Sequence, residues 1–154
     1  MAVSLLYQLY DVKRGADHIY TINPMEVEAA QSHGVDFTGY AYGGISGRVF
    51  NDHPPGAVPV FRLYQPELGD QLYTSNPIER WTAIHNLLYR DEGVAFYLYP
   101  TYFHGTAPLF RLYRSGYVQP YAIGHFYTTS WPEAELAVRA FSYILEEIVG
   151  YMFR

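Results

Sequence analysis

Residues 61–74 of this chain have the sequence FRLYQPELGDQLYT, and two closely related stretches occur elsewhere in it. Residues 7–21 are YQLYDVKRGADHIYT, and residues 110–128 are FRLYRSGYVQPYAIGHFYT. Each stretch has an aromatic residue, a long polar residue and Leu-Tyr, then a loop, and then an apolar residue followed by Tyr-Thr. The Tyr-Thr pairs lie about fifty residues apart, which is the spacing of a structural repeat. The sequence therefore predicts a fold built from three copies of one unit.

Each copy predicts a β-hairpin, then a short helix, then a further strand. Side chains alternate between two faces in both arms of each hairpin, as in half-buried strands. Every helix is expected to begin after a capping residue that is followed three positions later by Glu, the pattern of a capping box. The caps are Asn23, Asn76 and Ser130. The last strands of the units are expected at residues 37–42, 92–99 and 144–153.

The expected architecture is an α+β fold of three tandem β-β-α-β repeats, at about residues 4–48, 58–103 and 107–154. Because the first and last repeats are as apolar as the middle one, an open array with polar ends is disfavoured. We therefore expect the repeats to close into one pseudo-threefold domain that spans residues 1–154. Apolar residues at helical spacing predict one buried face on each of the later helices. These residues are Ile78, Trp81, Ile84 and Leu88 in the second helix and Ala134, Val138 and Phe141 in the third. Trp131, beside a cap, is expected to be partly exposed.

Composition excludes several classes of protein. Hydrophobic residues make up 49% of the 154 residues and charged residues 16%, as in a globular domain. A net charge of −5 argues against a nucleic-acid partner, and no apolar run predicts insertion into a membrane. The start MAVSLLYQLY has no basic segment, which favours a cytoplasmic protein or one exported without a classical signal peptide. The 17 tyrosines favour a recognition surface, because the ring can stack and the hydroxyl can form hydrogen bonds.

Polar and aromatic residues around the predicted hairpins are the candidate ligand-binding groups. Arg62 and Tyr64 share one strand face, and so do Gln71 and Tyr73. Planar donors and carboxylates can bind the vicinal hydroxyls of a sugar while an aromatic ring covers its apolar face. The candidates are Asp17, His18, Tyr20, Arg62, Tyr64, Asp70, Gln71, Tyr73, Glu92, Arg111, Tyr113, His125, Tyr127 and Glu146. An alternative stays open, in which Arg62 and Arg111 form internal salt bridges with Glu92 and Glu146.

No catalytic, metal or cofactor site is predicted. Glycoside hydrolysis needs two carboxylates at a fixed separation, and only the second repeat offers such a pair, Asp70 and Glu92. His18 and His125 occupy corresponding positions in the first and third repeats. The second repeat has Gln71 at this position, and Gln could not act as a base there. The sequence contains no HExxH motif, phosphate-binding loop or G-x-S-x-G motif.

The motifs FRLY…GDQLYT…NPIE and FRLY…GHFYTT…E resemble a tandem-repeat family with units of the type YRLYNP…GDHFYTT…E…EG. That family is a domain of unknown function found in fungal proteins and as modules attached to bacterial wall-degrading enzymes. Its association with wall hydrolases implies, by analogy, binding to a polysaccharide.

This chain departs from the family pattern at several positions. Gln8 replaces the Arg of RLY in the first repeat. The Asp-His pair matches Asp17-His18, whereas the second repeat has Asp70-Gln71 and the third has Gly124-His125. The Glu-Gly pair matches Glu92-Gly93, against Glu146-Glu147 in the third repeat and Thr38-Gly39 in the first. The second repeat is the most complete, so a single strong site is expected there.

The expected function is that of a non-catalytic, lectin-like carbohydrate-binding protein with up to three related sites. Its partners would be glycans or glycoconjugates, and multivalency would raise a low affinity per site. Association of several copies of the chain stays open. A protein-interaction or inhibitor scaffold is the alternative, and a glycan-cleaving enzyme is the third hypothesis.

Overall fold

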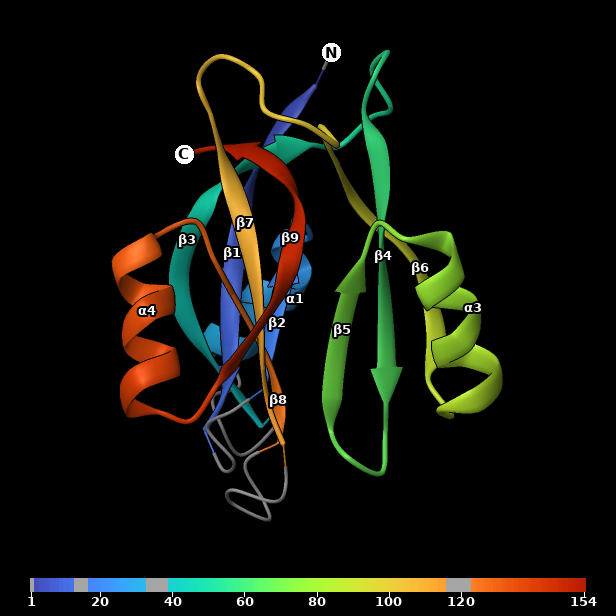
Figure 1. Cartoon of the computed structure of the whole chain (residues 1–154), viewed down its shortest axis with the longest axis vertical. Coiled ribbons are helices and arrows are strands. Elements are labelled where there is room, and N and C mark those ends of the chain that lie inside the picture. Colours follow the sequence, from blue (N-terminus) through green and yellow to red (C-terminus); the bar gives the residue numbers. More distant parts are fainter. Residues whose placement is uncertain (1, 13–16, 33–38, 116–122) are drawn as a thin grey trace.

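Antiparallel strands make up most of the structure, a computed structural model that describes residues 2–12, 17–32, 39–115 and 123–154. More than twice as many of these residues lie in strands as in helices (Figure 1). The elements in chain order are β1 (Val3–Asp11), β2 (His18–Thr21), α1 (Pro24–Ser32), β3 (Tyr40–Phe50), β4 (Val58–Gln65), β5 (Asp70–Thr74), α3 (Pro77–Asn86), β6 (Arg90–Leu98), β7 (Thr106–Arg114), β8 (Gly124–Thr128), α4 (Trp131–Ala140) and β9 (Ile144–Phe153).

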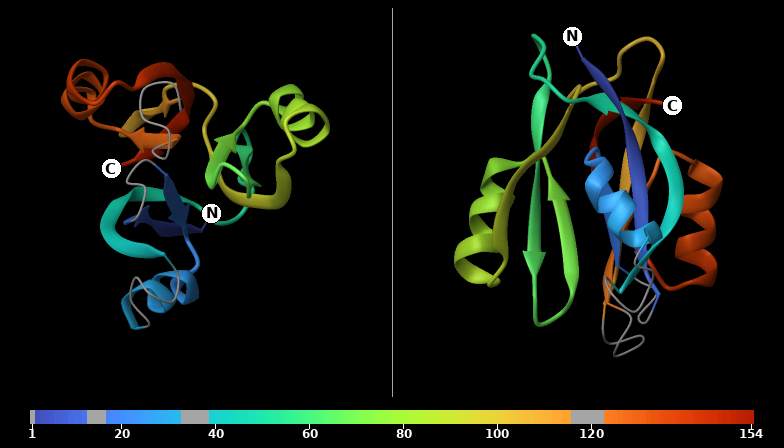
Figure 2. Two further views of the ribbon diagram at one scale, coloured as in Figure 1. Left: turned by 90° about the horizontal axis from the view of Figure 1, so that it is seen from below. Right: turned by 180° about the vertical axis from the view of Figure 1, so that it is seen from behind.

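The nine strands belong to one sheet. Three hairpins, β1–β2, β4–β5 and β7–β8, are each extended by the strand that follows the helix, because β3 pairs with β1, β6 with β4 and β9 with β7. Ends of these outer strands then pair with one another, at Phe50–Tyr97 and Arg48–Phe153. Seen along the long axis, the hairpins surround a common centre and the helices lie outermost (Figure 2).

The predicted α+β fold of three closed β-β-α-β repeats was wrong. The structure is a sheet-rich fold in which the nine strands of the described residues form one mostly antiparallel sheet. Two physical reasons explain the error. The outer strands pair across the predicted repeat boundaries, and the short helices bury few side chains, which are Val27 and Ala30 in α1, Ala83 in α3, and Ala134 and Ala137 in α4.

The predicted buried faces of the helices were also mostly wrong. Ile78, Trp81 and Leu88 are 75%, 56% and 66% exposed, and Val138 and Phe141 are exposed as well. A short helix that lies close against a sheet can turn only small side chains inward, so alanines occupy the contact. Trp131 is exposed, as predicted. The caps are confirmed in α3 and α4, where the side chains of Asn76 and Ser130 accept backbone N–H groups.

Strand β3 extends well beyond the predicted residues 37–42. It covers Tyr40–Phe50, and residues 37 and 38 lie outside the described part of the chain. Gly43, Gly44 and Gly47 lie within the strand. A side chain at Gly47 would come within 2.6 Å of the Phe153 carbonyl oxygen, so glycine allows β3 to pass this close to the end of β9.

Candidate functional site

Three tyrosines form the centre of the core. Tyr20, Tyr73 and Tyr127 are at most 3% exposed, and their rings pack edge to face at 5.2 to 5.8 Å. The backbone N–H of Tyr20 donates to the Tyr73 hydroxyl at 2.8 Å, that of Tyr73 to Tyr127 at 2.7 Å, and that of Tyr127 to Tyr20 at 3.0 Å. These hydrogen bonds join the three hairpins in a closed cycle. The three tyrosines, predicted as ligand contacts, lie in the core.

Two aspartates tie the first hairpin to the second and the second to the third. Asp17 is fully buried and accepts hydrogen bonds from the Gln71 backbone N–H and the Tyr40 hydroxyl, both at 2.8 Å. Asp70 is equally buried and accepts from the His125 backbone N–H at 3.1 Å and from the Tyr89 hydroxyl. Both predicted candidates therefore serve internal contacts.

His125 is held between two carboxylates. Its Nδ1 lies 2.9 Å from Asp70 and its Nε2 lies 3.0 Å from Glu146. Burial opposes the positive charge, but the two carboxylates outweigh burial and raise the pKa of His125 to about 9. The imidazolium thus donates to both partners at neutral pH. Burial, together with the nearby Asp70, raises the pKa of Asp17 to about 8.

Two hairpins are each linked to the preceding helix by one arginine. Arg62 donates from Nη1 to both carboxylate oxygens of Glu26 at 3.0 Å, and its Nε lies 3.2 Å from Glu92. Arg111 binds Glu79 in a two-point contact at 2.6 and 2.8 Å, and its Nε lies 3.0 Å from Glu146. The Arg111 side chain is only 4% exposed. The salt bridges to Glu92 and Glu146 considered from the sequence are thus present.

The helix glutamates in these contacts were not predicted from the sequence. Glu26 and Glu79 follow their caps by three residues, and a capping box explained them locally. In the structure they bind the arginine of the next hairpin instead. The sequence signals this pairing only through the recurrence of both residue types in the repeated stretches. Each arginine binds the glutamate of the helix before it, and a local pattern does not say which arginine meets which glutamate.

The remaining predicted candidates lie around these internal contacts. Gln71 is buried and accepts from Arg62 Nε at 3.2 Å. The Tyr113 ring lies 4.7 Å from the His125 ring, and Tyr64 pairs with Gln71 across the β4–β5 hairpin.

The interface between hairpins β7–β8 and β1–β2, here called the third interface, is built differently. Gly124 stands where the other hairpins have Asp17 and Asp70, and Gln8 stands where they have arginine. Strand register shows a further exchange. Gln8 pairs opposite Gly44 as Arg111 pairs opposite Glu147, so Gly43, rather than Thr38, corresponds to Glu92 and Glu146. The three positions that hold Asp, Arg and strand Glu at the other interfaces are thus Gly124, Gln8 and Gly43 here.

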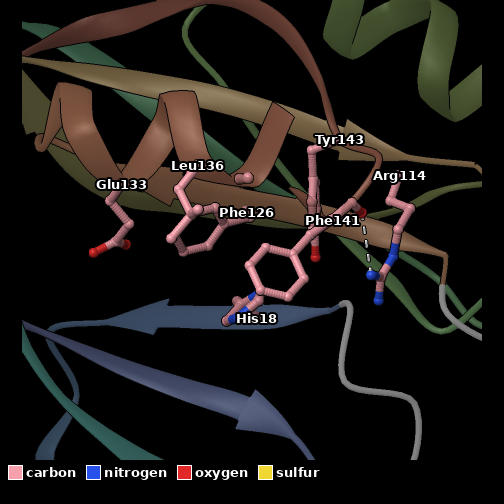
Figure 3. A pocket seen from close by; sticks show the side chains of 8 residues that line it. His18, Arg114, Phe126, Glu133, Leu136, Phe141 and Tyr143 are labelled. Atoms are coloured by element: carbon pink, nitrogen blue, oxygen red, sulfur yellow. Dashed lines mark hydrogen bonds between the residues drawn. The ribbon is translucent and has the colours of Figure 1, made fainter. Parts of the chain in front are cut away.

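A pocket of ≈ 250 Å³ lies at the third interface (Figure 3). We call it the interface pocket. It is lined by His18, Arg114, Phe126, Glu133, Leu136, Ala137, Phe141 and Tyr143. Phe126, Leu136 and Phe141 give it apolar walls, while Glu133 and Arg114 lie toward opposite ends (Figure 3). The His18 ring lies 5.1 Å from the Phe126 ring, so the pocket joins β2 to the β8–α4 region.

Tyr143 lines the pocket at the place where the third hairpin has Gly124 instead of the aspartate of the other two hairpins. Tyr40 and Tyr89 follow the first and second helices and donate to Asp17 and Asp70. Tyr143 has the corresponding place after α4, but Gly124 offers it no carboxylate, and Tyr143 lines the pocket. Arg114 lies 5.0 Å from the Tyr143 ring centre and donates to the Phe141 carbonyl at 3.4 Å. Of the predicted candidates, only His18 lines this pocket.

A second groove preserves more of the predicted candidates. It has a volume of ≈ 410 Å³ and lies along the contact of Arg62 with Glu26 and Glu92. Within the described part of the chain, no three His, Asp or Glu side chains converge as ligands of a metal ion would. No helix there has the length and apolar character to cross a membrane.

The chain is thus a sheet-rich protein with a pocket between its first and last hairpins. The model of a domain of unknown function, DUF5648, matches residues 5–153. The chain therefore belongs to the DUF5648 family. No curated protein and no solved structure matches it.

Proposed function

We propose that this protein binds carbohydrate without cleaving it, and that the interface pocket is the binding site. The observation that supports the proposal is the combination of aromatic walls with a carboxylate and a guanidinium toward opposite ends of one pocket. A sugar ring has an apolar face, which stacks on aromatic rings, and an edge of hydroxyls, which accept from Arg and donate to Glu.

The residues suit this chemistry individually. Phe141 is 53% exposed, so its ring is accessible to a ligand. Glu133 and Arg114 supply charged acceptors and donors, which form stronger hydrogen bonds than neutral groups. The volume lies just below the roughly 300–1,000 Å³ typical of sites for drug-sized ligands. A single sugar residue, such as the end of a glycan chain, is the occupant of matching size.

The proposal is non-catalytic because of the charges in the pocket. Glu133 is the one carboxylate among the described lining residues. Glycoside hydrolysis uses a pair of carboxylates on either side of the scissile bond. A binding site has no such requirement.

We also propose one principal site rather than three equivalent ones. The other two interfaces are filled by Asp17 with Gln71 and by Asp70 with His125. A ligand there would compete with buried internal hydrogen bonds, whose loss costs about 1–3 kcal/mol for each unsatisfied group.

The test is a glycan array followed by titration calorimetry of any glycan that binds. Phe141→Ala should weaken binding about tenfold, since loss of an aromatic contact worth about 1.4 kcal/mol corresponds to that factor. Phe103→Ala is the matched control, because Phe103 is equally exposed at 54% but does not line the interface pocket. An array without hits, or equal affinity of wild type and Phe141→Ala, would reject the proposal.

A protein-interaction scaffold is the second candidate. Ile78 and Trp81 are exposed on α3, where an apolar surface could contact another protein. Recovery of one stoichiometric protein partner, lost on Trp81→Ala, together with a negative glycan array would favour this candidate.

A further inference from the structure

The third interface contains a second cavity, which we call the Gln8 cavity. It has a volume of ≈ 190 Å³ and is lined by Gln8, Ile45, Ser46, Tyr127, Thr128, Thr129, Ser130 and Glu133. Its position corresponds to that of the groove that holds Arg62 at the first interface, which lies between hairpins β1–β2 and β4–β5. The chain therefore provides internal examples of what this position binds.

Strand register establishes the correspondence on the hairpin side. Arg62 pairs opposite Tyr73, and Arg111 pairs opposite Tyr127. Gln8 pairs opposite Tyr20 in the same way. Gln8 thus occupies the arginine position, with a side chain that is shorter and uncharged.

The helix side of the cavity keeps its carboxylate. Glu133 follows the Ser130 cap by three residues, as Glu26 and Glu79 follow theirs. Glu26 binds the guanidinium of Arg62, and Glu79 binds that of Arg111. Within the described ranges, the Glu133 carboxylate makes neither a hydrogen bond nor an ion pair.

The strand side of the cavity has lost the second carboxylate and gained space. Glu92 and Glu146 contact the arginines at the other two interfaces at 3.2 and 3.0 Å. Gly43 stands in their place and has no side chain. Acceptors remain, because Tyr127 corresponds to Tyr73, whose carbonyl accepts from Arg111 at 3.2 Å.

The Gln8 cavity opens onto a larger groove of ≈ 580 Å³. The cavity and the groove share Ile45, Ser46, Thr129 and Ser130. The groove also contains Trp131, which is 51% exposed, and Pro132. A chain that placed a cation in the cavity would thus run along an apolar surface.

We propose that the Gln8 cavity binds the guanidinium of an arginine side chain that belongs to another polypeptide, with an apolar neighbour of that arginine against Trp131. A planar guanidinium donates two parallel hydrogen bonds to a carboxylate, as Arg111 does to Glu79. The incoming arginine would supply to Glu133 the contact that Arg62 and Arg111 supply to Glu26 and Glu79. This inference does not depend on carbohydrate binding in the interface pocket.

Acetyl-arginine-amide, titrated into the isotopically labelled full chain and followed by NMR, is the probe. The expected result is a set of shift changes at Gln8, Ser46 and Glu133 with a dissociation constant in the millimolar range. Acetyl-citrulline-amide keeps the shape of the side chain without its charge. It should bind at least about tenfold more weakly, because a hydrogen bond between charged groups is stronger than one between neutral groups.

Variants locate the site. Gln8→Arg should fill the cavity with an internal arginine that binds Glu133, abolish binding of the probe and raise the melting temperature. Glu133→Gln should also abolish binding of the probe, whereas Glu135→Gln, an exposed neighbour on α4, should not. Equal binding to wild type and Gln8→Arg, or no shift change up to about 50 mM probe, would overturn the inference. Phe141→Ala changes a residue that lines the interface pocket but not the Gln8 cavity, so it should weaken glycan binding and leave binding of the probe unchanged.

Discussion

His125 shows how a single side chain links two carboxylates at the second interface, which lies between hairpins β4–β5 and β7–β8. Its ring joins Asp70 of one hairpin to Glu146 of β9 and is almost completely buried. A buried imidazolium between two carboxylates favours the folded state as long as the imidazole is protonated. The contribution of His125 to stability must therefore depend on pH.

The sign of that dependence follows from the raised pKa. The folded pKa of about 9 exceeds the ordinary value near 6.5, so the stabilisation is fully present below pH ~6.5 and is lost as pH rises through about 9. Urea unfolding between pH 6 and 10 should show this loss. His125→Gln should fold, since Gln71 holds the corresponding position, and should lose this part of the pH dependence. Parallel pH profiles of wild type and variant would contradict the assignment.

Among the elements, α1 and α3 are each joined to the next hairpin by one glutamate. Glu26 and Glu79 connect α1 and α3 to the arginine of the next hairpin. The apolar contribution is small, because α1 buries Val27 and Ala30, α3 buries one alanine and α4 buries two. Ion pairs of low exposure thus connect elements that the sheet alone would leave apart.

Arg111→Gln would give the second interface the residue that Gln8 provides at the third. It would leave Glu79 and Glu146 without their shared cation, and breaking a buried pair in this way costs about 3–5 kcal/mol. We expect a clearly lowered melting temperature and urea midpoint. Arg114→Gln is the control, because Arg114 is more exposed and contacts neither glutamate. A change of less than about 1 kcal/mol in the free energy of unfolding would show that Arg111 is not a structural link.

Local signals predicted the elements better than their contacts. Alternation and capping are local, so the hairpins and the caps at Asn76 and Ser130 could be found from the sequence. The path of β3 could not, because its glycines resemble a loop unless the neighbouring end of β9 is known. The predicted fold class was wrong because the helices were given the same structural importance as the strands.

The candidate site was less accessible to prediction. The salt bridges of Arg62 and Arg111 to Glu92 and Glu146 were considered as an alternative, but Glu26 and Glu79 already had a local explanation. The interface pocket brings His18 against Phe126 and Phe141, which come from the first and last thirds of the chain. Only the packing of the first hairpin beside the last one reveals it.

At the scale of the whole molecule, three departures from the repeated pattern meet at one place. Gln8, Gly43 and Gly124 come from distant parts of the sequence, yet all three alter the third interface. Asp, Arg and Glu side chains link the other two interfaces, whereas the third retains the tyrosine hydrogen bonds and two cavities. We infer that the incomplete interface, rather than the most complete repeat, is where the protein binds its ligands.

A crystal of the full chain soaked in a mixture of monosaccharides would locate the bound sugar. We expect it in the interface pocket, with its ring against Phe141 and its hydroxyls within hydrogen-bond distance of Glu133 and Arg114. A sugar bound instead along Arg62, Glu26 and Glu92, or an empty interface pocket in a protein that binds glycans in solution, would contradict this expectation.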